Sequence, residues 1–263
     1  MSAPTLDRNP HDMIDCSEVT ATIADPQTDP RLSEQYVRCL SDDGVGTVLL
    51  IGVVHDHPAS VFRVAHVLRS VTPETLALEL PPLATGLFQI YARDRFTPPR
   101  LGGEMSAAIQ AAGDVRTVGI DAPNRRYTRL LVERLLANPV PRDVLTIVLR
   151  DLLYGFAHAM ACRIGSFIGS ITPLRPRVYT HLEYDASLLD SPSVQAGDEA
   201  SNLSQHQVFL KAIETPPAIE LIDEARDATM GRRLRELREN GDVVAVVGME
   251  HLDALEAEIR GVA

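Results

Sequence analysis

The chain has 263 residues, 45% of them hydrophobic, and a formal net charge of −11 with a sequence pI near 5.2. This length and apolar content suit one large α/β domain with a sizeable core and argue against wholesale disorder. The acidic balance argues against a nucleic-acid partner and against a negatively charged membrane surface, because both favour a basic face.

The basic residues are almost all arginine, since Lys211 is the one lysine among 25 basic residues. A GC-rich genome would explain this preference by itself. Together with the surplus of Asp and Glu, it is also typical of a halophilic archaeon, in which a hydrated acidic surface keeps proteins soluble.

The three cysteines, Cys16, Cys39 and Cys162, are widely spaced and form no Cys-x-x-Cys pair. Such a sparse, odd set predicts reduced thiols rather than a disulfide framework or a zinc ribbon. Residues 1–15 lack the apolar core of a secretory signal. The most hydrophobic stretch, Val144 to Ile171, is interrupted by charged residues, which predicts a buried or partner-facing helix instead of a membrane span. The sequence therefore predicts a cytoplasmic protein.

Residues 1–30 are polar and proline-bearing, and we expect them to form a loose lead-in to a single α/β domain over residues 31–263. Strands are predicted over residues 36–40, 47–54, 75–80, 116–120 and 242–247. Helices are predicted over residues 58–68, 103–112, 127–136, 143–168, 217–239 and 250–260. Residues 172–205 have no clear period, and Ser191–Gly197 is the expected mobile loop. The alternation predicts a central, mixed but mostly parallel sheet with helices on both faces.

Acidic and imidazole side chains follow four of the predicted strands, at the points where these strands end. In chain order they are His55, Glu79, Asp121 and His251. Because the carboxyl ends of parallel strands meet at one edge of a sheet, we expect these side chains to share a rim. Two imidazoles and a carboxylate can hold a divalent ion with one position open for water. We therefore predict that His55, Glu79 and His251 bind Mn²⁺, Co²⁺ or Zn²⁺.

Gly52 and Gly248 each stand three residues before one of these histidines, where a glycine permits a tight turn or a close approach. Each candidate also has a structural alternative. A single histidine at a strand end is often held by a hydrogen bond in the fold, and Glu79, Asp121 and Glu104 could simply favour the N-termini of helices. The interpretation as a site depends on His55, Glu79 and His251 occurring together at the ends of predicted strands.

Several blocks of this sequence resemble the TraB/PrgY family, and they occur in the family's order. They are Val48-Leu-Leu-Ile-Gly-Val-Val-His55 with Ser60, Ala77-Leu-Glu79-Leu, Gly102-Gly-Glu104-Met leading to Asp121 and Thr128-Arg129, the helix Leu221–Met230 with Arg226 and Asp227, and the closing strand with Gly248-Met-Glu-His251. The blocks span about residues 47–259.

The resemblance implies a fold shared with Tiki proteases, erythromycin esterases and ChaN-like haem-binding proteins. Tiki proteins are metal-dependent peptidases with two Gly-x-x-His motifs, to which His55 and His251 correspond. The first hypothesis is thus a metal-dependent, peptidase-like hydrolase acting on a peptide or another carbonyl substrate. Glu79 would complete the metal shell or deprotonate the attacking water, and Arg226 or Arg129 would stabilise the oxyanion.

The sequence departs from the family pattern at two places: Val53 replaces the usual Thr, and Ala225 splits the Glu-Arg-Asp run. The resemblance therefore does not define a substrate for this chain. Two alternatives stay open. One is metal-free hydrolysis of the erythromycin-esterase kind, with His55 as base and Glu79 orienting it. The other is a non-enzymatic module that binds a peptide or small molecule in the same cleft. The long apolar helix could supply a homodimer face, with core packing as its alternative use.

Overall fold

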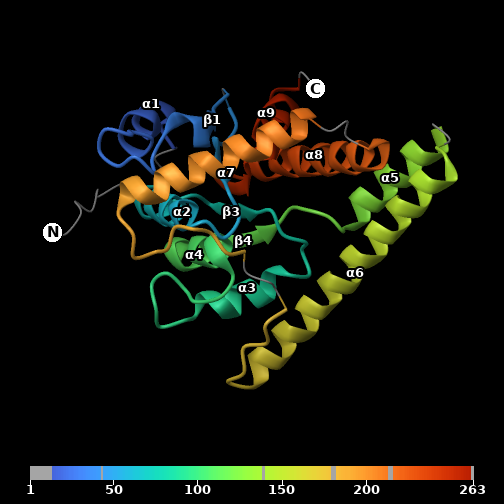
Figure 1. The fold of residues 1–263 in the computed structure, drawn as a ribbon, viewed down its shortest axis with the longest axis horizontal. Helices are drawn as coiled ribbons and strands as arrows, with labels where there is room; N and C mark the ends of the chain where they lie inside the picture. The colour runs from blue at the N-terminus through green and yellow to red at the C-terminus, as the bar shows by residue number, and fades with distance from the viewer. Residues whose placement is uncertain (1–13, 43, 138–139, 179–181, 213–215, 262–263) are drawn as a thin grey trace.

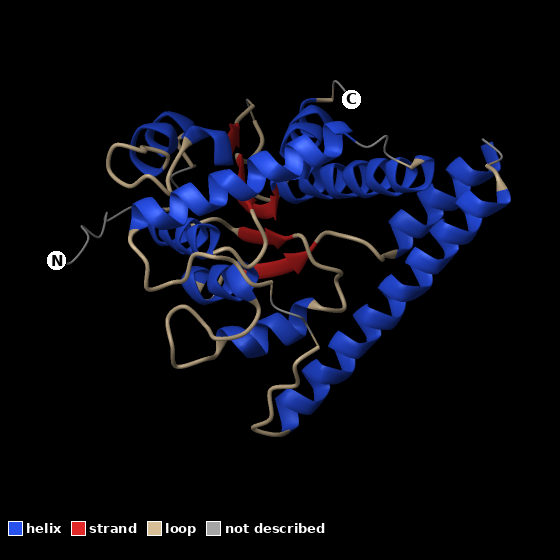
Figure 2. Cartoon of the chain, viewed as in Figure 1, coloured by secondary structure: helices blue, strands red, loops and turns tan. Residues whose placement is uncertain are grey.

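The computed structural model describes residues 14–42, 44–137, 140–178, 182–212 and 216–261, without the side chains of residues 22 and 209–212. Its centre is a five-stranded sheet in the order β1-β2-β5-β3-β4 (Figure 2). The strands are β1 (Val37–Leu40), β2 (Val48–Val53), β3 (Thr75–Leu78), β4 (Arg116–Gly119) and β5 (Val243–Gly248). β1 pairs antiparallel with β2 and all other pairs are parallel. The predicted α/β class with a mostly parallel sheet is confirmed.

Helices cover both faces of the sheet (Figure 1). One face packs against α2 (Pro58–Ser70), α3 (Thr85–Ala92) and α4 (Gly103–Ala112). The other packs against α8 (Pro217–Arg238) and α9 (Leu252–Arg260). Successive residues of a strand point to opposite faces of the sheet. Leu49 and Ile51 of β2 therefore pack in the first layer, with α2, α3 and α4, and Val48 and Leu50 pack in the second layer, with α8 and α9.

The remaining elements lie around these layers (Figure 1). They are α1 (Cys16–Glu18), η1 (Val19–Ile23), η2 (Glu34–Tyr36), α5 (Arg125–Ala137), α6 (Arg142–Ile171), α7 (Pro192–Ala212) and η3 (Met249–His251). A third apolar cluster joins α5, the beginning of α6 and the beginning of α8. It links the outer helices to the second layer.

Apart from helices of five residues or fewer, two described helices were not predicted from the sequence, α3 and α7. Most of the segment Ser191–Gly197, predicted as a mobile loop, lies in the first turns of α7. This helix is anchored by buried polar contacts: Glu199 accepts hydrogen bonds from Ser60 Oγ at 2.5 Å and from Arg63. Because its anchors are polar, α7 has no apolar stripe for the hydrophobic period to reveal.

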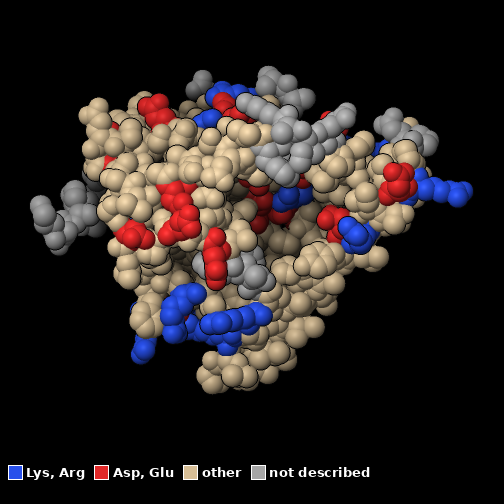
Figure 3. Space-filling view, viewed as in Figure 1, with Lys and Arg blue, Asp and Glu red and all other residues tan. Residues whose placement is uncertain are grey.

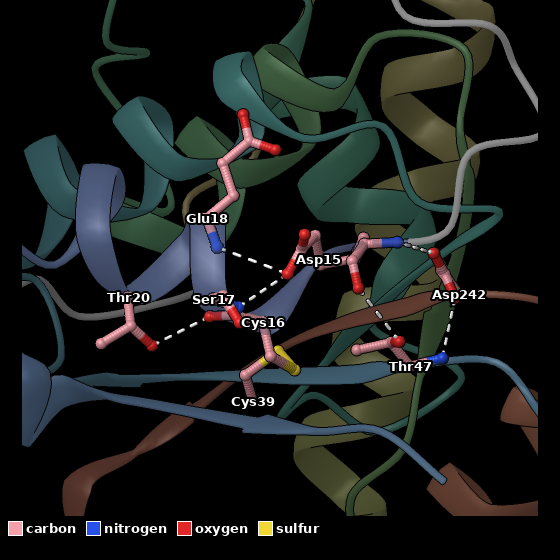
Figure 4. The surroundings of a disulfide bond; sticks show 9 residues. Asp15, Cys16, Ser17, Glu18, Thr20, Cys39, Thr47 and Asp242 are labelled. Atoms are coloured by element: carbon pink, nitrogen blue, oxygen red, sulfur yellow. Dashed lines mark hydrogen bonds between the residues drawn. A yellow bond between two sulfur atoms is a disulfide. The ribbon is translucent and has the colours of Figure 1, made fainter. Parts of the chain in front are cut away.

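The described part of the predicted lead-in, residues 14–30, is packed rather than loose, while residues 1–13 lie outside the described residues. Its apolar side chains Ile14, Val19 and Ile23 join the first core layer. Asp242, just before β5, accepts hydrogen bonds from the backbone N–H of Ile14 and of Thr47 (Figure 4). These bonds join the lead-in to the sheet.

A disulfide links Cys16 of α1 to Cys39 of β1 (Figure 4). The prediction of three reduced thiols is therefore wrong for this pair, and Cys162 is free and buried. The two bonded residues are 23 positions apart, and they meet because α1 folds back beside β1. Chain spacing alone does not show this juxtaposition.

The predicted helix over residues 143–168 is confirmed as α6, which runs along one edge of the molecule (Figure 1). Core packing was one use predicted for it, but most of its large apolar side chains are exposed. Among the described helices, α6 is long and apolar enough to cross a membrane by length and composition, and 17% of its most apolar window is buried.

Candidate functional site

The carboxyl ends of the four parallel strands lie side by side at one rim. The register pairs Val53 with Gly248 at the ends of β2 and β5, and Leu78 with both Val246 and Gly119. The strands therefore finish at nearly the same level. Each of these strand ends is followed closely in the chain by one predicted site residue: His55, Glu79, Asp121 or His251.

The imidazole of His55 is held by a buried carboxylate. Its Nδ1 donates a hydrogen bond to Glu104 Oε1 at 2.8 Å, and Glu104 is 1% exposed in the first turn of α4. The other oxygen, Oε2, accepts from the backbone N–H of Asp56 at 2.8 Å. Tyr184 Oη donates to the carbonyl of His55 at 2.6 Å. These contacts fix both the ring and its loop.

The loop after His55 depends on an unusual backbone and on a neighbouring glycine. Asp56 has a φ of 61°, in the left-handed region. A Cβ on Gly103 would lie 2.1 Å from Asp56 Oδ1, so only glycine lets α4 begin this close to the loop. The close approach brings the carboxylate of Glu104 within hydrogen-bonding distance of Nδ1 of His55.

The charge on Glu104 favours the protonated form of His55. Burial lowers the pKa of this imidazole, but the hydrogen bond to Glu104, its charge and the charges of Glu79 and Glu250 together raise the pKa to about 10. A pKa of about 10 favours the imidazolium form of His55 at neutral pH.

Glu79 and Asp121 share one guanidinium, that of Arg226 in α8. Arg226 Nη2 lies 2.7 Å from Glu79 Oε1 and 2.8 Å from Asp121 Oδ2, and its Nε donates to Asp121 Oδ1 at 3.0 Å. Burial alone would raise the pKa of Glu79, but the nearby imidazole of His251 and the charge of Arg226 lower it to about 2. Glu79 is therefore ionised throughout the neutral range.

His251 is buried beside this network, with 3% of its surface exposed. Its Nδ1 donates to Asp227 Oδ1 of α8 at 2.6 Å, while Nε2 lies 3.3 Å from Glu79 Oε1 but is too poorly aligned for a standard hydrogen bond. Burial lowers the pKa of His251, and the carboxylates of Asp227 and Glu79 outweigh it and raise the pKa to about 10. His251 is thus a second buried imidazolium.

The two predicted glycines allow close approaches around His251. Gly248 N–H donates to Glu79 Oε2 at 2.5 Å. A Cβ on Gly52 would lie 2.4 Å from Met249 Sδ and 2.5 Å from Leu252 Cδ1, so β2 accepts the segment that carries His251 only with glycine there. Both glycines therefore serve the packing of the rim.

A cavity of about 250 Å³ opens at the rim on the side of α3 and α4. Its polar lining groups are His55, Glu79, Glu104 and His158, and its other lining residues are Leu80, Pro81, Ala84, Phe88, Gly102 and Met105. His251 does not line it. Arg226 lines a separate cavity of about 270 Å³, bordered by α5, α6 and α8.

The two predicted imidazoles are held by helices of different layers. His55 is bonded to Glu104 of α4 in the first layer and His251 to Asp227 of α8 in the second. Glu79 lies near both, since its Oε1 is 3.3 Å from Nε2 of His251 and it lines the same cavity as His55. That the two imidazoles face each other across one pocket stays a prediction.

These donors do not fit a shared ion as they lie. Among the described residues, no three His, Cys, Asp or Glu side chains come close enough to hold one metal ion. Glu79 Oε1 is taken by Arg226, and Nδ1 of each imidazole is bonded to a different carboxylate. The predicted ion at His55, Glu79 and His251 stays a prediction.

The structure also separates one predicted residue from the site and adds others. Arg129 is on the surface of α5, where it pairs with Glu133 at 2.8 Å, so it has no contact with the cavity. Asp227, Tyr184 and His158 contribute to the site but were not among the predicted site residues. Asp227 belongs to the segment Leu221–Met230 that resembles the Glu-Arg-Asp helix of the family, whereas no sequence signal marked Tyr184 or His158.

Comparison of the chain with family models found no match, and comparisons with curated proteins and with solved structures found no significant match. Membership of the TraB/PrgY family therefore stays a prediction from the motifs. What the structure establishes is a mostly parallel α/β domain with a histidine–carboxylate pair at the rim of its sheet.

Proposed function

We propose that the protein is a hydrolase of small carbonyl substrates, such as an ester or the end of a peptide, and that His55 carries its proton transfers. One observation supports this most: a histidine on a cavity wall is hydrogen-bonded through Nδ1 to a buried carboxylate, that of Glu104. A carboxylate in this position fixes the tautomer and orientation of the ring and stabilises the imidazolium that forms during reaction.

The reaction uses His55 in its neutral form. Nε2 takes a proton from a water molecule as the water oxygen bonds to the carbonyl carbon. The tetrahedral intermediate then expels its leaving oxygen or nitrogen, which receives that proton from Nε2. The products are an acid and an alcohol or amine, and His55 is neutral again. Glu104 keeps its charge throughout and acts as a positioning residue.

The first turn of α4 supplies groups for the developing oxyanion. The cavity is lined by Gly102, Glu104 and Met105, and α4 has no side-chain cap. The first intrahelical bond runs from Ser106 N–H to the Gly102 carbonyl, so the N–H groups before it have no partner within the helix. A helix N-terminus also carries a partial positive charge that favours an anion.

The cavity defines the substrate class. At about 250 Å³ it accepts a small group rather than a whole macromolecule. Apolar side chains such as Phe88 and Leu80 suit an alkyl or aryl portion. The ionised carboxylate of Glu79 disfavours an anionic substrate and can accept a hydrogen bond from an amide or ammonium N–H.

The test is hydrolysis of a panel of p-nitrophenyl esters and short peptides by the purified protein. At pH 10, where about half of the wild-type His55 is neutral, we expect His55→Ala and Glu104→Gln to lower kcat/KM by about 100-fold or more, the usual size of a general-base contribution. His206→Ala, in an exposed histidine of α7, is the matched control and should leave the rate unchanged. Turnover that survives His55→Ala would contradict the proposal. Binding of panel members without any turnover would favour the non-enzymatic module instead.

A further inference from the structure

The outer side of α6 carries a continuous apolar stripe. Leu153, Phe156, Met160, Ile164, Phe167 and Ile171 recur at intervals of three or four residues, which places them on one face of the helix. Between residues 152 and 171 the one Asp, Glu, Lys or Arg is Arg163. Figure 3 shows few charged side chains along the edge where Figure 1 places this helix.

The distribution of residue size around α6 is the reverse of that in an ordinary core helix. Its buried residues include Ala159, Cys162 and Gly165, while Leu153 is 70% exposed and Phe167 is 64% exposed. The small residues let α3 approach closely, since a Cβ on Gly169 of α6 would lie 3.0 Å from Cδ1 of Ile90 in α3. The domain therefore uses the small face of α6 and leaves the large apolar face to solvent.

The exposed area matches what a stable dimer needs. Taking roughly 200 Å² for each large apolar residue, the exposed parts of the stripe amount to roughly 700 Å². Leu149 and Tyr154, which are also exposed, flank the stripe and add to it. A standard interface buries about 800 Å² per partner, whereas the largest apolar patch on a typical monomer is about 300–600 Å².

From this match we infer that the apolar stripe of α6 is the interface of a homodimer, in which it packs against the same stripe of a second copy. A membrane span would require α6 to leave α3 and α8, against which its inner face is packed. It would also place Arg163 in the apolar layer. Pairing of two copies retains the inner contacts. This inference does not depend on the proposed hydrolase activity.

Two-fold symmetry gives the dimer a specific consequence at the middle of the stripe. In a symmetric interface the same patch of both copies meets, so a residue near its centre contacts its own equivalent. Met160, which is 48% exposed, lies at the middle of the exposed apolar run from Leu149 to Ile171. A cysteine there can bond to the same cysteine of the partner, while Cys162 is fully buried and does not compete.

The experiment combines sedimentation velocity over a wide concentration range with cross-linking of Met160→Cys under mild oxidation. We expect a dimer for the wild type, a covalent dimer for Met160→Cys, and a dimer weakened by roughly a hundred-fold or more in Leu153→Glu/Phe167→Glu, since each charge enters the interface twice. Leu189→Glu and Leu189→Cys, at a residue 97% exposed outside α6, are matched controls and should behave as wild type.

Folding of the double variant is checked by circular dichroism, and the Met160→Cys result stands independently of it. A monomeric wild type at all concentrations would overturn the inference, as would a dimer that the two glutamates leave intact. Co-sedimentation with phosphatidylcholine vesicles provides the remaining outcome: binding by wild-type monomers that the double variant loses would assign the stripe to a membrane and overturn the dimer.

Discussion

Replacing Glu104 by glutamine removes one negative charge beside His55 and turns the oxygen that faces Nδ1 into an NH2 group. Glutamine keeps the shape of the side chain, and its carbonyl can still accept from the backbone N–H of Asp56. Burial would then oppose only the more distant charges of Glu79 and Glu250, so the pKa of His55 should fall from about 10 to near or below its ordinary value of 6.5. The proton affinity of the ring would fall by about a thousand-fold.

The change has a signature in the pH dependence of both activity and stability. Hydrolysis needs neutral His55, so wild-type activity should rise with pH through an inflection near 10, whereas the activity of Glu104→Gln should rise through an inflection near or below pH 6.5 to a lower plateau. A histidine whose pKa is raised on folding stabilises the folded state fully below pH 6.5, and this contribution is lost as the pH rises through about 10. The variant should therefore lose most stability below pH 6.5 and least near pH 10.

The assays are the NMR titration of the His55 ring, the pH–rate profile and urea unfolding at several pH values. Glu133→Gln, at a half-exposed carboxylate of α5, is the matched control. An unchanged His55 pKa in Glu104→Gln would refute the reasoning, because the geometry assigns the main raising influence to that carboxylate. An activity profile that keeps its inflection while the pKa falls would show that His55 does not carry the rate.

Three further predictions concern stability and metal. Arg226→Gln should lower the free energy of unfolding by about 3–5 kcal/mol, because two buried carboxylates lose their shared guanidinium. Arg129→Gln should have no measurable effect. Equal urea midpoints for the two variants would contradict this prediction. Cys16→Ser/Cys39→Ser should lose about 3 kcal/mol because the disulfide closes a loop of 23 residues, and calorimetry of the reduced wild type should give the same loss. Chelator should leave hydrolysis intact, and elemental analysis should find no stoichiometric metal; an ion lost in His251→Ala together with activity would restore the metal-dependent hypothesis.

Much of the fold was predictable because strong local patterns fix it. The apolar runs of β2 and β5 read as central strands, and the register confirms that their ends are level. Two of the longer helices, α3 and α7, were not predicted from the sequence, for different reasons. α3 is short, and α7 is held by buried polar contacts such as Glu199 with Arg63, which leave no apolar period to read.

The sequence by itself determined which chemical groups reach the rim of the sheet, because strand ends are set by local apolar runs and turns. Only the tertiary structure decided which groups meet there. His55 is bonded to Glu104 of α4 and His251 to Asp227 of α8, because each ring is held by the helix that packs against its loop. The disulfide between Cys16 and Cys39 and the outward apolar face of α6 likewise depend on long-range packing, which residue spacing does not encode.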